Sequence, residues 1–291
     1  MAQARRGRLS RSARPRDLLR VALPVKGRLR EPSFHLLEDA GLGPEQPGGR
    51  ALAFPCRNAP VEVLLVNAKD VPEYVQDGVV DCGITGIDLV RERGARVHEL
   101  LPLGFGSCRL EAAVPAESEV QALEDLAGSS VATVYPHLTT QLLPVDVELV
   151  DVTSSVEIAP RLGLADAIVD LVSSGNTLRT NGLRSLGVLL ESEAVLVAGD
   201  PETAAPFAAM LRAVVEARRH RYLMLNAPVA SLDAIEALLA PRVASVLPLA
   251  DEGMVAVHAL VPSKEVWRLL PELEAAGGSS ILIVPVERMA A

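Results

Sequence analysis

The sequence predicts an α/β protein that ends in a small β-α-β-β-α-β domain, and three observations support this prediction. Hydrophobic residues make up 49% of the chain and charged residues 22%, a balance typical of globular proteins. Aromatic residues are only 3%, so the core must be built from Val, Leu, Ile and Ala, which suits sheets covered by helices. Short β-branched runs alternate with helical patterns, which indicates mainly parallel sheets. At 291 residues, the chain is long enough for two or three compact units.

The first predicted elements are a strand over residues 20–23 and a helix with Phe34, Leu36 and Leu37 on its apolar side. This helix is expected to end at Gly41, as helices commonly do. Pro72 marks the start of another helix. Further strands are expected at residues 61–66, 79–84, 111–114, 130–134, 147–152, 167–172 and 188–190. Because parallel sheets bind ligands at the carboxyl ends of their strands, the residues after each strand are candidates for a site.

The pattern changes near residue 203, where one long helix is predicted over residues 203–220. The elements expected after it are strand 222–226, helix 231–239, strand 243–247, strand 254–261, helix 264–276 and strand 281–286. This order is the ferredoxin-like arrangement. Small domains of this plan often bind effectors, although the fold alone does not show that they do.

The charge of the chain argues against a general nucleic-acid-binding protein. Its net charge is −9, whereas proteins that bind nucleic acids carry basic surfaces. Residues 1–16 differ from the rest, with six Arg and no acid. We expect a disordered basic extension there, although a transit peptide or an RNA-binding arm would share this composition. No apolar run reaches the roughly 20 residues that a membrane helix needs, so a soluble protein is expected.

The three cysteines, Cys56, Cys82 and Cys108, are widely spaced and odd in number, and no Cys-x-x-Cys pair is present. This pattern argues against a disulfide framework or a structural zinc site. It favours a reducing cytoplasm, with all three thiols buried as small hydrophobic groups.

The strongest chemical signal is the segment DAIVDLVSSGNTL at residues 166–178. A hydrophobic strand ends there in a polar turn, and a helix is expected to begin near Thr177. Hydroxyl groups, a glycine and free backbone amides at a helix N-terminus form an anion cradle. Asp170 would lie at its rim, placed to bind ribose hydroxyls or a phosphate-bound Mg²⁺. An ordinary N-capped turn has the same residue types, so the segment alone leaves both interpretations open.

Three further segments are candidates for ligand contacts. Lys26 and Arg28 flank a glycine directly after the first strand, where cations suit phosphate groups. The segment DCGITGID at residues 81–88 places two glycines and two carboxylates around a strand end. Glu157 lies in a predicted first helical turn, where an acid either stabilises the helix or faces a ligand. A solvated basic turn, a tight turn and a capping acid would explain each of them equally well.

Together, the segments resemble the ATP phosphoribosyltransferase family. The resemblance lies in LPVKGRL (23–29), DVPEYVQDGVVDCGITGIDLV (70–90), LGFGSCRL (103–110), ATVYPHLT (132–139), SVEIAPRLGLADAIVDLVSSGNTLRTNGL (155–183) and PLADEGMVAVHALVP (248–262). It extends from about Leu19 to Met289, and the 155–183 segment is the most specific part. The C-terminal stretch is similar to the long form of the family, which carries its own regulatory domain and needs no separate regulatory subunit.

The resemblance implies a catalytic part of two periplasmic-binding-protein-like α/β lobes with the active site between them. Lobe I would comprise residues 17–104 and 185–213, lobe II residues 105–184, and the regulatory histidine-binding domain, ACT-like in plan, residues 214–291, after a disordered extension at 1–16. The implied reaction is attack by N1 of ATP on C1 of phosphoribosyl pyrophosphate, which gives 1-(5-phosphoribosyl)-ATP and pyrophosphate. This is the first step of histidine biosynthesis, with Mg²⁺ as cofactor and histidine as feedback inhibitor. A cytoplasmic homo-oligomer, from dimer to hexamer, is implied as well, with no nucleic-acid or membrane partner.

The resemblance also implies three groups of site residues. The phosphoribosyl pyrophosphate site is expected at Lys26, Asp170, Ser173, Ser174, Gly175, Asn176, Thr177 and Leu178. The ATP site is expected at Arg28, Lys69, Asp88, Tyr135 and Glu157. Asn226 and Ser245 are the candidate contacts for histidine. Mg²⁺ is expected mainly on the substrate phosphates, with Asp170 as the candidate protein ligand.

Cations are missing near three positions, Asn67, Ser107 and Thr140, where relatives commonly carry one. Each charged hydrogen bond is worth roughly 1.5–3 kcal/mol, so their loss is expected to weaken the hold on two polyanionic substrates unless other Arg or Lys residues compensate. In the C-terminal domain, Ala244 and Ser245 replace a common Pro-Thr pair, and Ser245 keeps the hydroxyl group.

Two other interpretations remain open from the sequence. A catalytically weakened or non-catalytic relative that binds a phosphorylated metabolite would explain the missing cations, although the loop from Asp170 to Leu178 is intact. A different phosphoribosyltransferase would share an acidic strand followed by a Ser/Thr-Gly-x-Thr loop, but the C-terminal domain argues against it.

Overall fold

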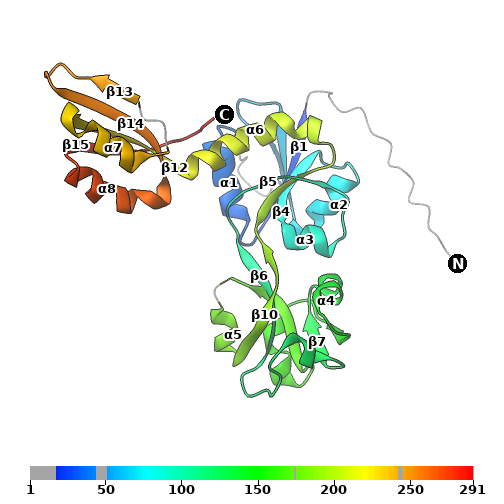
Figure 1. Ribbon diagram of the computed structural model, residues 1–291. Helices are drawn as coiled ribbons and strands as arrows, with labels where there is room; N and C mark the ends of the chain where they lie inside the picture. Colours follow the sequence, from blue (N-terminus) through cyan, green and yellow to red (C-terminus); the bar gives the residue numbers. More distant parts are fainter. Residues whose placement is uncertain (1–17, 44–50, 174, 242–244, 291) are drawn as a thin grey trace. The chain divides into compact units, whose positions relative to one another are not determined.

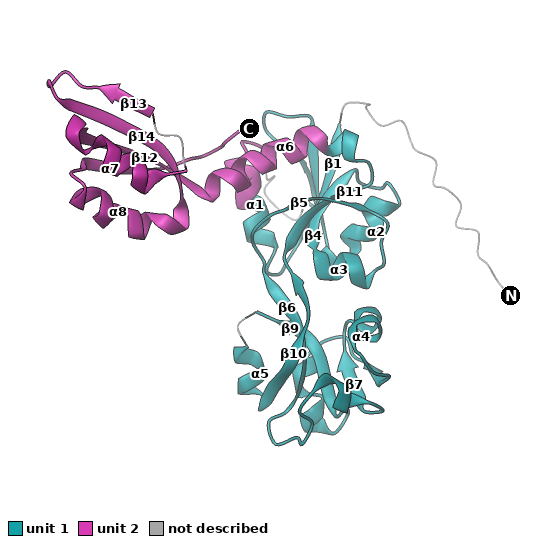
Figure 2. Ribbon diagram, in the orientation of Figure 1, with its two compact units in different colours: residues 1–34, 44–204 teal, residues 35–43, 205–291 magenta. Residues whose placement is uncertain are grey.

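The computed structural model describes residues 18–43, 51–173, 175–241 and 245–290 (Figure 1). The basic extension expected at residues 1–16 lies outside the described residues. The described chain forms two compact units (Figure 2): residues 18–34 with 51–204, and residues 35–43 with 205–290.

The first lobe of the larger unit is built on a six-stranded sheet in the order β2-β3-β1-β4-β11-β5. Its strands are β1 (Leu19–Pro24), β2 (Ala53–Pro55), β3 (Val61–Val66), β4 (Cys82–Gly86), β5 (His98–Pro102) and β11 (Ala194–Ala198). The chain enters α1 (Arg30–Asp39) after β1, the short helices η1 (Ala68–Asp70) and α2 (Val71–Gln76) after β3, and α3 (Ile87–Glu92) after β4. β1 pairs in parallel with β3 and β4, whereas β11 is antiparallel to β4 and β5.

The second lobe has a five-stranded sheet in the order β10-β6-β9-β7-β8. Its strands are β6 (Cys108–Pro115), β7 (Ser130–Thr133), β8 (Glu148–Asp151), β9 (Ala167–Val172) and β10 (Leu183–Ser192). Its helices are η2 (Leu123–Leu126), α4 (Pro136–Leu142), η3 (Val156–Ile158), η4 (Pro160–Leu162) and α5 (Asn176–Thr180). β7 pairs in parallel with β8 and β9, and β6 is antiparallel to β9 and β10. Alternate strand residues are buried in two clusters, one with Leu110 and Val169 and the other with Ala113 and Ile168, so the sheet is covered on both faces.

The α/β class is confirmed, and the larger unit has two lobes that are each built on a sheet of their own, but the expectation of mainly parallel sheets is wrong. Within the described part of the two lobes, four strand pairings are parallel and five are antiparallel. Three strands that were not expected, β2, β5 and β11, all pair antiparallel. An apolar run shows that a strand will form but not which strand it will pair with, and this is why the sequence misled. β10 also crosses the expected boundary between the lobes at residues 184–185 and is bonded to β6.

The smaller unit contains the expected β-α-β-β-α-β domain. After α6 (Pro201–Arg218) come β12 (His220–Pro228), η5 (Val229–Ser231), α7 (Leu232–Leu239), β13 (Ser245–Pro248), β14 (Met254–Pro262), η6 (Ser263–Glu265), α8 (Val266–Ala275) and β15 (Ser279–Pro285). The antiparallel order β13-β14-β12-β15 is that of a ferredoxin-like sheet. Leu223, Leu225 and Val257 face the helices and are buried with Ile235 and Leu269.

The described helices include none that is long and apolar enough to cross a membrane. All three cysteines are free thiols with buried side chains, as expected. Burial raises the pKa of the Cys56 thiol to about 11, which keeps it protonated and unreactive at neutral pH.

Candidate active site

The first-lobe candidates follow neighbouring parallel strands. Lys26 follows β1, Lys69 lies in η1 after β3, and Asp88 lies in the first turn of α3 after β4. Pro24 at the end of β1 lies opposite Val66 at the end of β3, so both loops leave the sheet at the same edge. Lys26 and Lys69 are exposed there, as phosphate-binding cations need to be.

The second-lobe candidates are arranged in the same way. Tyr135 follows β7, Glu157 lies in η3 after β8, and the loop beginning at Ser173 follows β9. Because β7 pairs in parallel with both β8 and β9, all three segments begin at one edge of the sheet. The structure therefore collects the predicted residues at the carboxyl ends of parallel strands in both lobes.

Asp88 lies at the centre of a buried polar cluster. Its side chain is 1% exposed, and the Ser192 hydroxyl donates a 2.5 Å hydrogen bond to Oδ1. The Tyr135 hydroxyl donates a 3.2 Å hydrogen bond to Oδ2 from the other lobe, and an Arg28 Nη lies 3.5 Å from Oδ1. Both carboxylate oxygens are thus occupied, so Asp88 holds Arg28, Tyr135 and Ser192 relative to one another.

Tyr135 is nearly as buried as Asp88, at 7% exposure. Burial raises the pKa of its phenol far above the ordinary value, and the negative charge of Asp88 raises it further. The phenol therefore stays protonated and acts as a hydrogen-bond donor, not as a base.

Glu92 makes a second connection between the lobes. Its carboxylate accepts hydrogen bonds from the backbone amides of His137 (3.1 Å) and Leu138 (2.9 Å) in the first turn of α4. These amides have no partner within their own helix, so an acid from α3 of the other lobe satisfies them.

Asp170 lies near the end of β9, with Glu111 of β6 directly opposite. Its Oδ1 accepts a 2.8 Å hydrogen bond from the backbone amide of Leu171. Burial raises the pKa of Asp170, and the nearby negative charge of Glu157 adds to the rise. The half-buried carboxylate has one protein hydrogen bond among the described residues, which leaves acceptor capacity for a ligand.

The raised pKa of Asp170 predicts a pH-dependent penalty on stability. At a pH below the ordinary pKa of 3.8, the carboxyl group is protonated in both the folded and the unfolded chain, so it does not reduce the stability of the fold. As the pH rises from 3.8 through the higher folded-state pKa, ionisation costs more in the folded protein and stability is lost. Asp170→Asn should therefore raise the melting temperature at pH 7.5, and the difference should shrink as the pH falls toward 4.

Thermal unfolding of both proteins across this range tests the prediction, with the exposed Asp146→Asn as the matched charge change. An Asp170→Asn protein that is less stable than the parent at pH 7.5 would contradict it.

The loop after β9 has the geometry of a tight polar turn. Gly175 is left-handed, with φ of 73°, and it precedes α5, which begins at Asn176. Ser173, Asn176 and Thr177 are exposed, whereas Leu178 is 6% exposed and packs in the core. Leu178 can therefore contact a ligand only through its backbone. Ser174, another predicted contact, lies outside the described residues.

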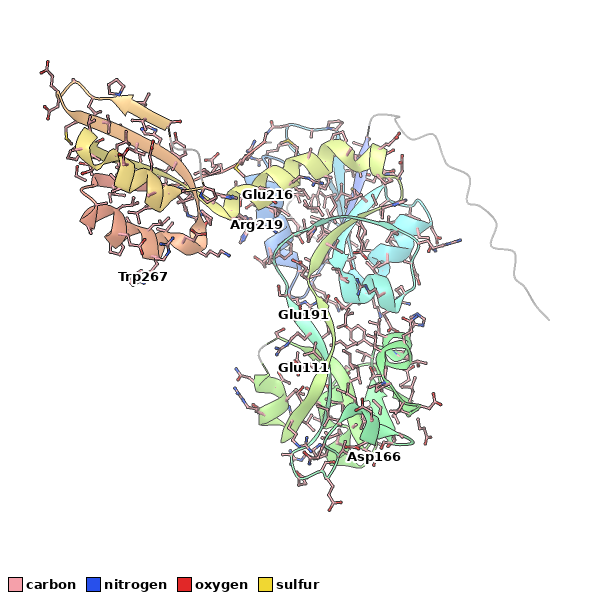
Figure 3. All side chains as sticks on the ribbon, in the orientation of Figure 1. Glu111, Asp166, Glu191, Glu216, Arg219 and Trp267 are labelled. Atoms are coloured by element: carbon pink, nitrogen blue, oxygen red, sulfur yellow. The ribbon has the colours of Figure 1, made fainter. Side chains whose placement is uncertain are left out.

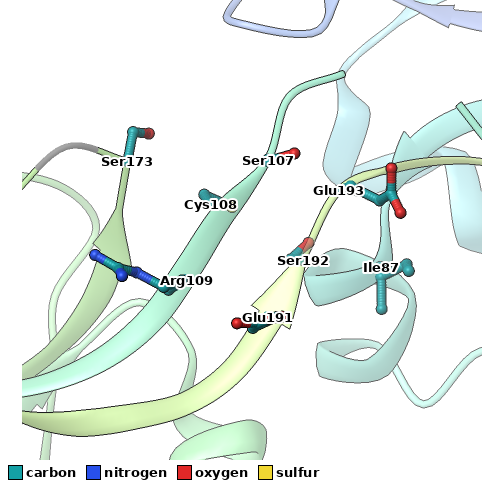
Figure 4. Close-up of a pocket in the computed structure, with 8 residues that line it drawn as sticks. All are labelled: Ile87, Ser107, Cys108, Arg109, Ser173, Glu191, Ser192 and Glu193. Carbon is teal, nitrogen blue, oxygen red and sulfur yellow. The ribbon is translucent and has the colours of Figure 1, made fainter. Parts of the chain in front are cut away.

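A cavity of about 480 Å³ opens beside this loop, between β6, β10 and the end of β9 (Figure 4). It is lined by Ile87, Ser107, Cys108, Arg109, Ser173, Glu191, Ser192 and Glu193. Ser173 is the one lining residue that was predicted for a substrate site. Figure 4 shows Arg109 and Ser173 at one end of the cavity, with Ile87 and Glu193 at the other.

The sequence did not point to Ser192, Arg109 or Glu111. Ser192 closes β10 and belongs to no motif, so only its contact with Asp88 reveals its role. Arg109 and Glu111 alternate with buried apolar residues in β6. The acid and the arginine within this otherwise apolar strand were the signal that could have drawn attention to both residues.

The described side chains include no group of three or more His, Cys, Asp or Glu residues able to hold a metal ion. Glu157 is near enough to Asp170 for its charge to raise the pKa of the Asp170 carboxyl group. One or two carboxylates of this kind suit Mg²⁺, which otherwise keeps its waters and binds substrate phosphates. The residues present thus fit a metal held mainly by substrate.

Asn226 and Ser245 lie on the same outer face of the ferredoxin-like sheet but are not neighbours. Asn226 lies opposite Ala256 and Ser245 opposite His258, so the whole of β14 runs between them. The Tyr222 hydroxyl lies 3.1 Å from His258 Nδ1 on this face. A single small ligand that contacts both predicted residues would lie across His258.

Two family models match the chain: ATP phosphoribosyltransferase over residues 67–217, and the HisG C-terminal domain over residues 217–288. An ATP phosphoribosyltransferase of Methanopyrus kandleri is 42% identical over 283 residues, which cover 94% of this chain and 99% of the relative. One of Gemmatimonas aurantiaca is 42% identical over 292 residues, with the same shares covered. Among solved structures, the ATP phosphoribosyl transferase (HisG:HisZ) complex from Thermotoga maritima has a TM-score of 0.60 at 25% identity. That likeness covers 68% of this chain and 99% of the other.

Proposed function

Because this chain belongs to the ATP phosphoribosyltransferase family, we propose that its second lobe holds the phosphoribosyl donor and its first lobe holds ATP. The family defines the reaction: phosphoribosyl is transferred from phosphoribosyl pyrophosphate to N1 of ATP, the first step of histidine biosynthesis. One observation supports the assignment of sites. The predicted residues of each lobe lie at the carboxyl ends of its parallel strands, where α/β proteins bind ligands.

The loop after β9 would hold the 5-phosphate of the phosphoribosyl donor. Ser173, Asn176 and Thr177 are exposed, and Gly175 brings the backbone close without a Cβ. Asp170 below the loop would accept hydrogen bonds from ribose hydroxyls. Lys26, exposed at the end of β1, would neutralise phosphate charge from the first lobe.

The ATP phosphates would be bound by Arg28 and Lys69. Arg28 is anchored by the buried Asp88, and Tyr135 holds the other oxygen of that carboxylate. Asp88 and Tyr135 would therefore act indirectly, by orienting Arg28 toward the nucleotide. Glu157, in η3, would line the same side.

The transfer breaks the bond from ribose C1 to the pyrophosphate oxygen and forms a bond from C1 to adenine N1. N1 already has a lone pair, so no strong base is needed. Positive charge develops on the ribose as pyrophosphate leaves, and the carboxylates of Asp170 and Glu157 would stabilise it. Catalysis would rest on the positioning of the two substrates and on this electrostatic contribution.

A bound Mg²⁺ would neutralise charge on the departing pyrophosphate, and Asp170 would be its protein ligand. The protein contributes the position of that carboxylate, which is fixed by the Leu171 amide.

Residues 214–291 would form the regulatory domain, with histidine bound at Asn226 and Ser245 on its outer sheet face. A domain of this kind within the chain would make a separate regulatory subunit unnecessary. We further propose a cytoplasmic homo-oligomer that passes from dimer to hexamer when histidine is bound.

The proposal is tested with the full chain, ATP, phosphoribosyl pyrophosphate and Mg²⁺, by following the absorbance of phosphoribosyl-ATP with and without histidine. We expect product formation that histidine suppresses, with Asn226→Ala requiring more histidine for the same suppression. Binding of either substrate without product, at high protein concentration, would favour a non-catalytic relative. Product formation that histidine does not affect would overturn only the regulatory part.

A further inference from the structure

We propose that Arg109, held by the buried Glu111, is a further phosphate-binding cation of the phosphoribosyl pyrophosphate site, an inference that rests on the proposed function. Arg109 lines the cavity beside the loop after β9 and lies at the same end as Ser173 (Figure 4). Its position in β6 is opposite Val172, the residue just before Ser173. The guanidinium is therefore placed next to the loop that would bind the 5-phosphate.

Glu111 fixes the inner side of this guanidinium. Its residue is 4% exposed, on the second-lobe strand β6 (Figure 3), and its Oε1 lies 2.9 Å from Arg109 Nε. The same oxygen is buried and has no partner with hydrogen-bond geometry. Glu111 therefore holds Arg109 by charge at close range, without a well-aligned hydrogen bond.

The outer side of Arg109 is available for a ligand. Its side chain is 46% exposed, and its two Nη groups have no hydrogen bond or ion pair among the residues that the structure describes. These two groups form the fork that binds phosphate oxygens in pairs. Two acids, Glu191 and Glu193, also line the cavity. Figure 4 shows Glu193 at the far end, whereas Glu191 is opposite Arg109 in the pairing of β10 with β6, so an anion at this end would be bound by Arg109 on the side away from Glu191.

Arg109 lies near Ser107, one of the positions at which the family resemblance led us to expect a cation. Ser107 lines the same cavity two positions earlier in the chain. Because both residues line it, Arg109 offers a positive charge to the same space. A buried carboxylate is costly unless it is paired, and Glu111 is placed where the pairing also directs that charge toward the loop.

Steady-state kinetics of the full-length protein test the proposal. Arg109→Met should raise the KM for phosphoribosyl pyrophosphate about 10- to 100-fold, with a change of less than about twofold in the KM for ATP. Arg109→Lys keeps the charge but loses the fork, so its KM for phosphoribosyl pyrophosphate should lie between that of the wild type and that of Arg109→Met. Glu111→Gln should raise the same KM about three- to tenfold, since the guanidinium is then held less firmly. The exposed Arg96→Met, outside the cavity lining, is the matched control.

Arg109→Met leaves the buried Glu111 unpaired and could impair folding, so the double variant Arg109→Met/Glu111→Gln accompanies it. If Glu111 acts only through Arg109, adding Glu111→Gln to Arg109→Met should cause no further rise in this KM. If the wild-type protein is active and the double variant changes the KM for phosphoribosyl pyrophosphate less than twofold, the role of Arg109 is overturned while the proposed function stands. A wild-type protein that forms no product would instead overturn the proposed function. Calorimetric titration with ribose 5-phosphate would then test Arg109 separately, because the proposed role of Arg109 requires weaker binding of this phosphate by the double variant.

Discussion

Asp170→Asn is expected to lower kcat/KM for phosphoribosyl pyrophosphate by at least about 100-fold. The carboxylate is proposed to accept hydrogen bonds from ribose hydroxyls, and each bond to a charged group contributes roughly 1.5–3 kcal/mol. The negative charge would also stabilise the positive ribose of the transition state, which an amide cannot do. Asn keeps the size of the side chain and can still accept the hydrogen bond from the Leu171 amide, so the fold should be preserved.

Initial rates at varied phosphoribosyl pyrophosphate and saturating ATP measure this effect. Most of the loss should appear in kcat, which separates Asp170 from Arg109, whose substitution is expected to act on KM. The exposed Asp146→Asn in the same lobe controls for the change in net charge. Full activity in Asp170→Asn would contradict the placement of the phosphoribosyl donor on β9.

The two expectations for Asp170 are linked by a single cause. Burial raises the pKa of the carboxyl group, so the ionised form that is proposed to serve catalysis destabilises the folded protein. An Asp170→Asn protein that is inactive and yet more stable at pH 7.5 would be a stability–activity trade-off located at one residue.

Asp88→Ala is expected to lower the free energy of unfolding of the two-lobed unit by about 2–4 kcal/mol. The substitution removes the acceptor of the Ser192 and Tyr135 hydroxyl groups and the partner of Arg28. Tyr135 and Ser192 are 7% and 5% exposed, so water cannot readily replace the lost acceptor. Asp88→Asn should cost less, because one oxygen remains.

Urea denaturation followed by far-UV circular dichroism measures this loss. Tryptophan fluorescence would not report it, because the single tryptophan, Trp267, is 90% exposed on α8 of the ferredoxin-like domain (Figure 3). The exposed Asp77→Asn is the matched control in the first lobe. Equal urea midpoints for Asp88→Ala and the parent would show that the cluster does not stabilise the lobes.

Local sequence patterns predicted most elements of the lobes and of the ferredoxin-like domain. The apolar run at 167–172 formed β9, and Gly175 took up the left-handed turn ahead of α5, because residue type and spacing act over a few positions. The strands β2, β5 and β11 were not predicted, and their pairing depends on residues far away in the chain. The main error in the predicted fold is that the antiparallel pairings of these strands were not foreseen.

Sequence patterns were enough to identify the family, most of the strands and helices, and the loop proposed to bind the phosphoribosyl donor. The folded structure was needed to find that Asp88 is buried against Ser192, a residue 104 positions away, and that Arg109 and Ser173 line one cavity with Glu111 paired to Arg109. The physical reason is the range of the forces concerned. Helix caps, turns and periodicity are local and can be read from neighbouring residues, whereas ion pairs and burial depend on which strands the folded chain brings together.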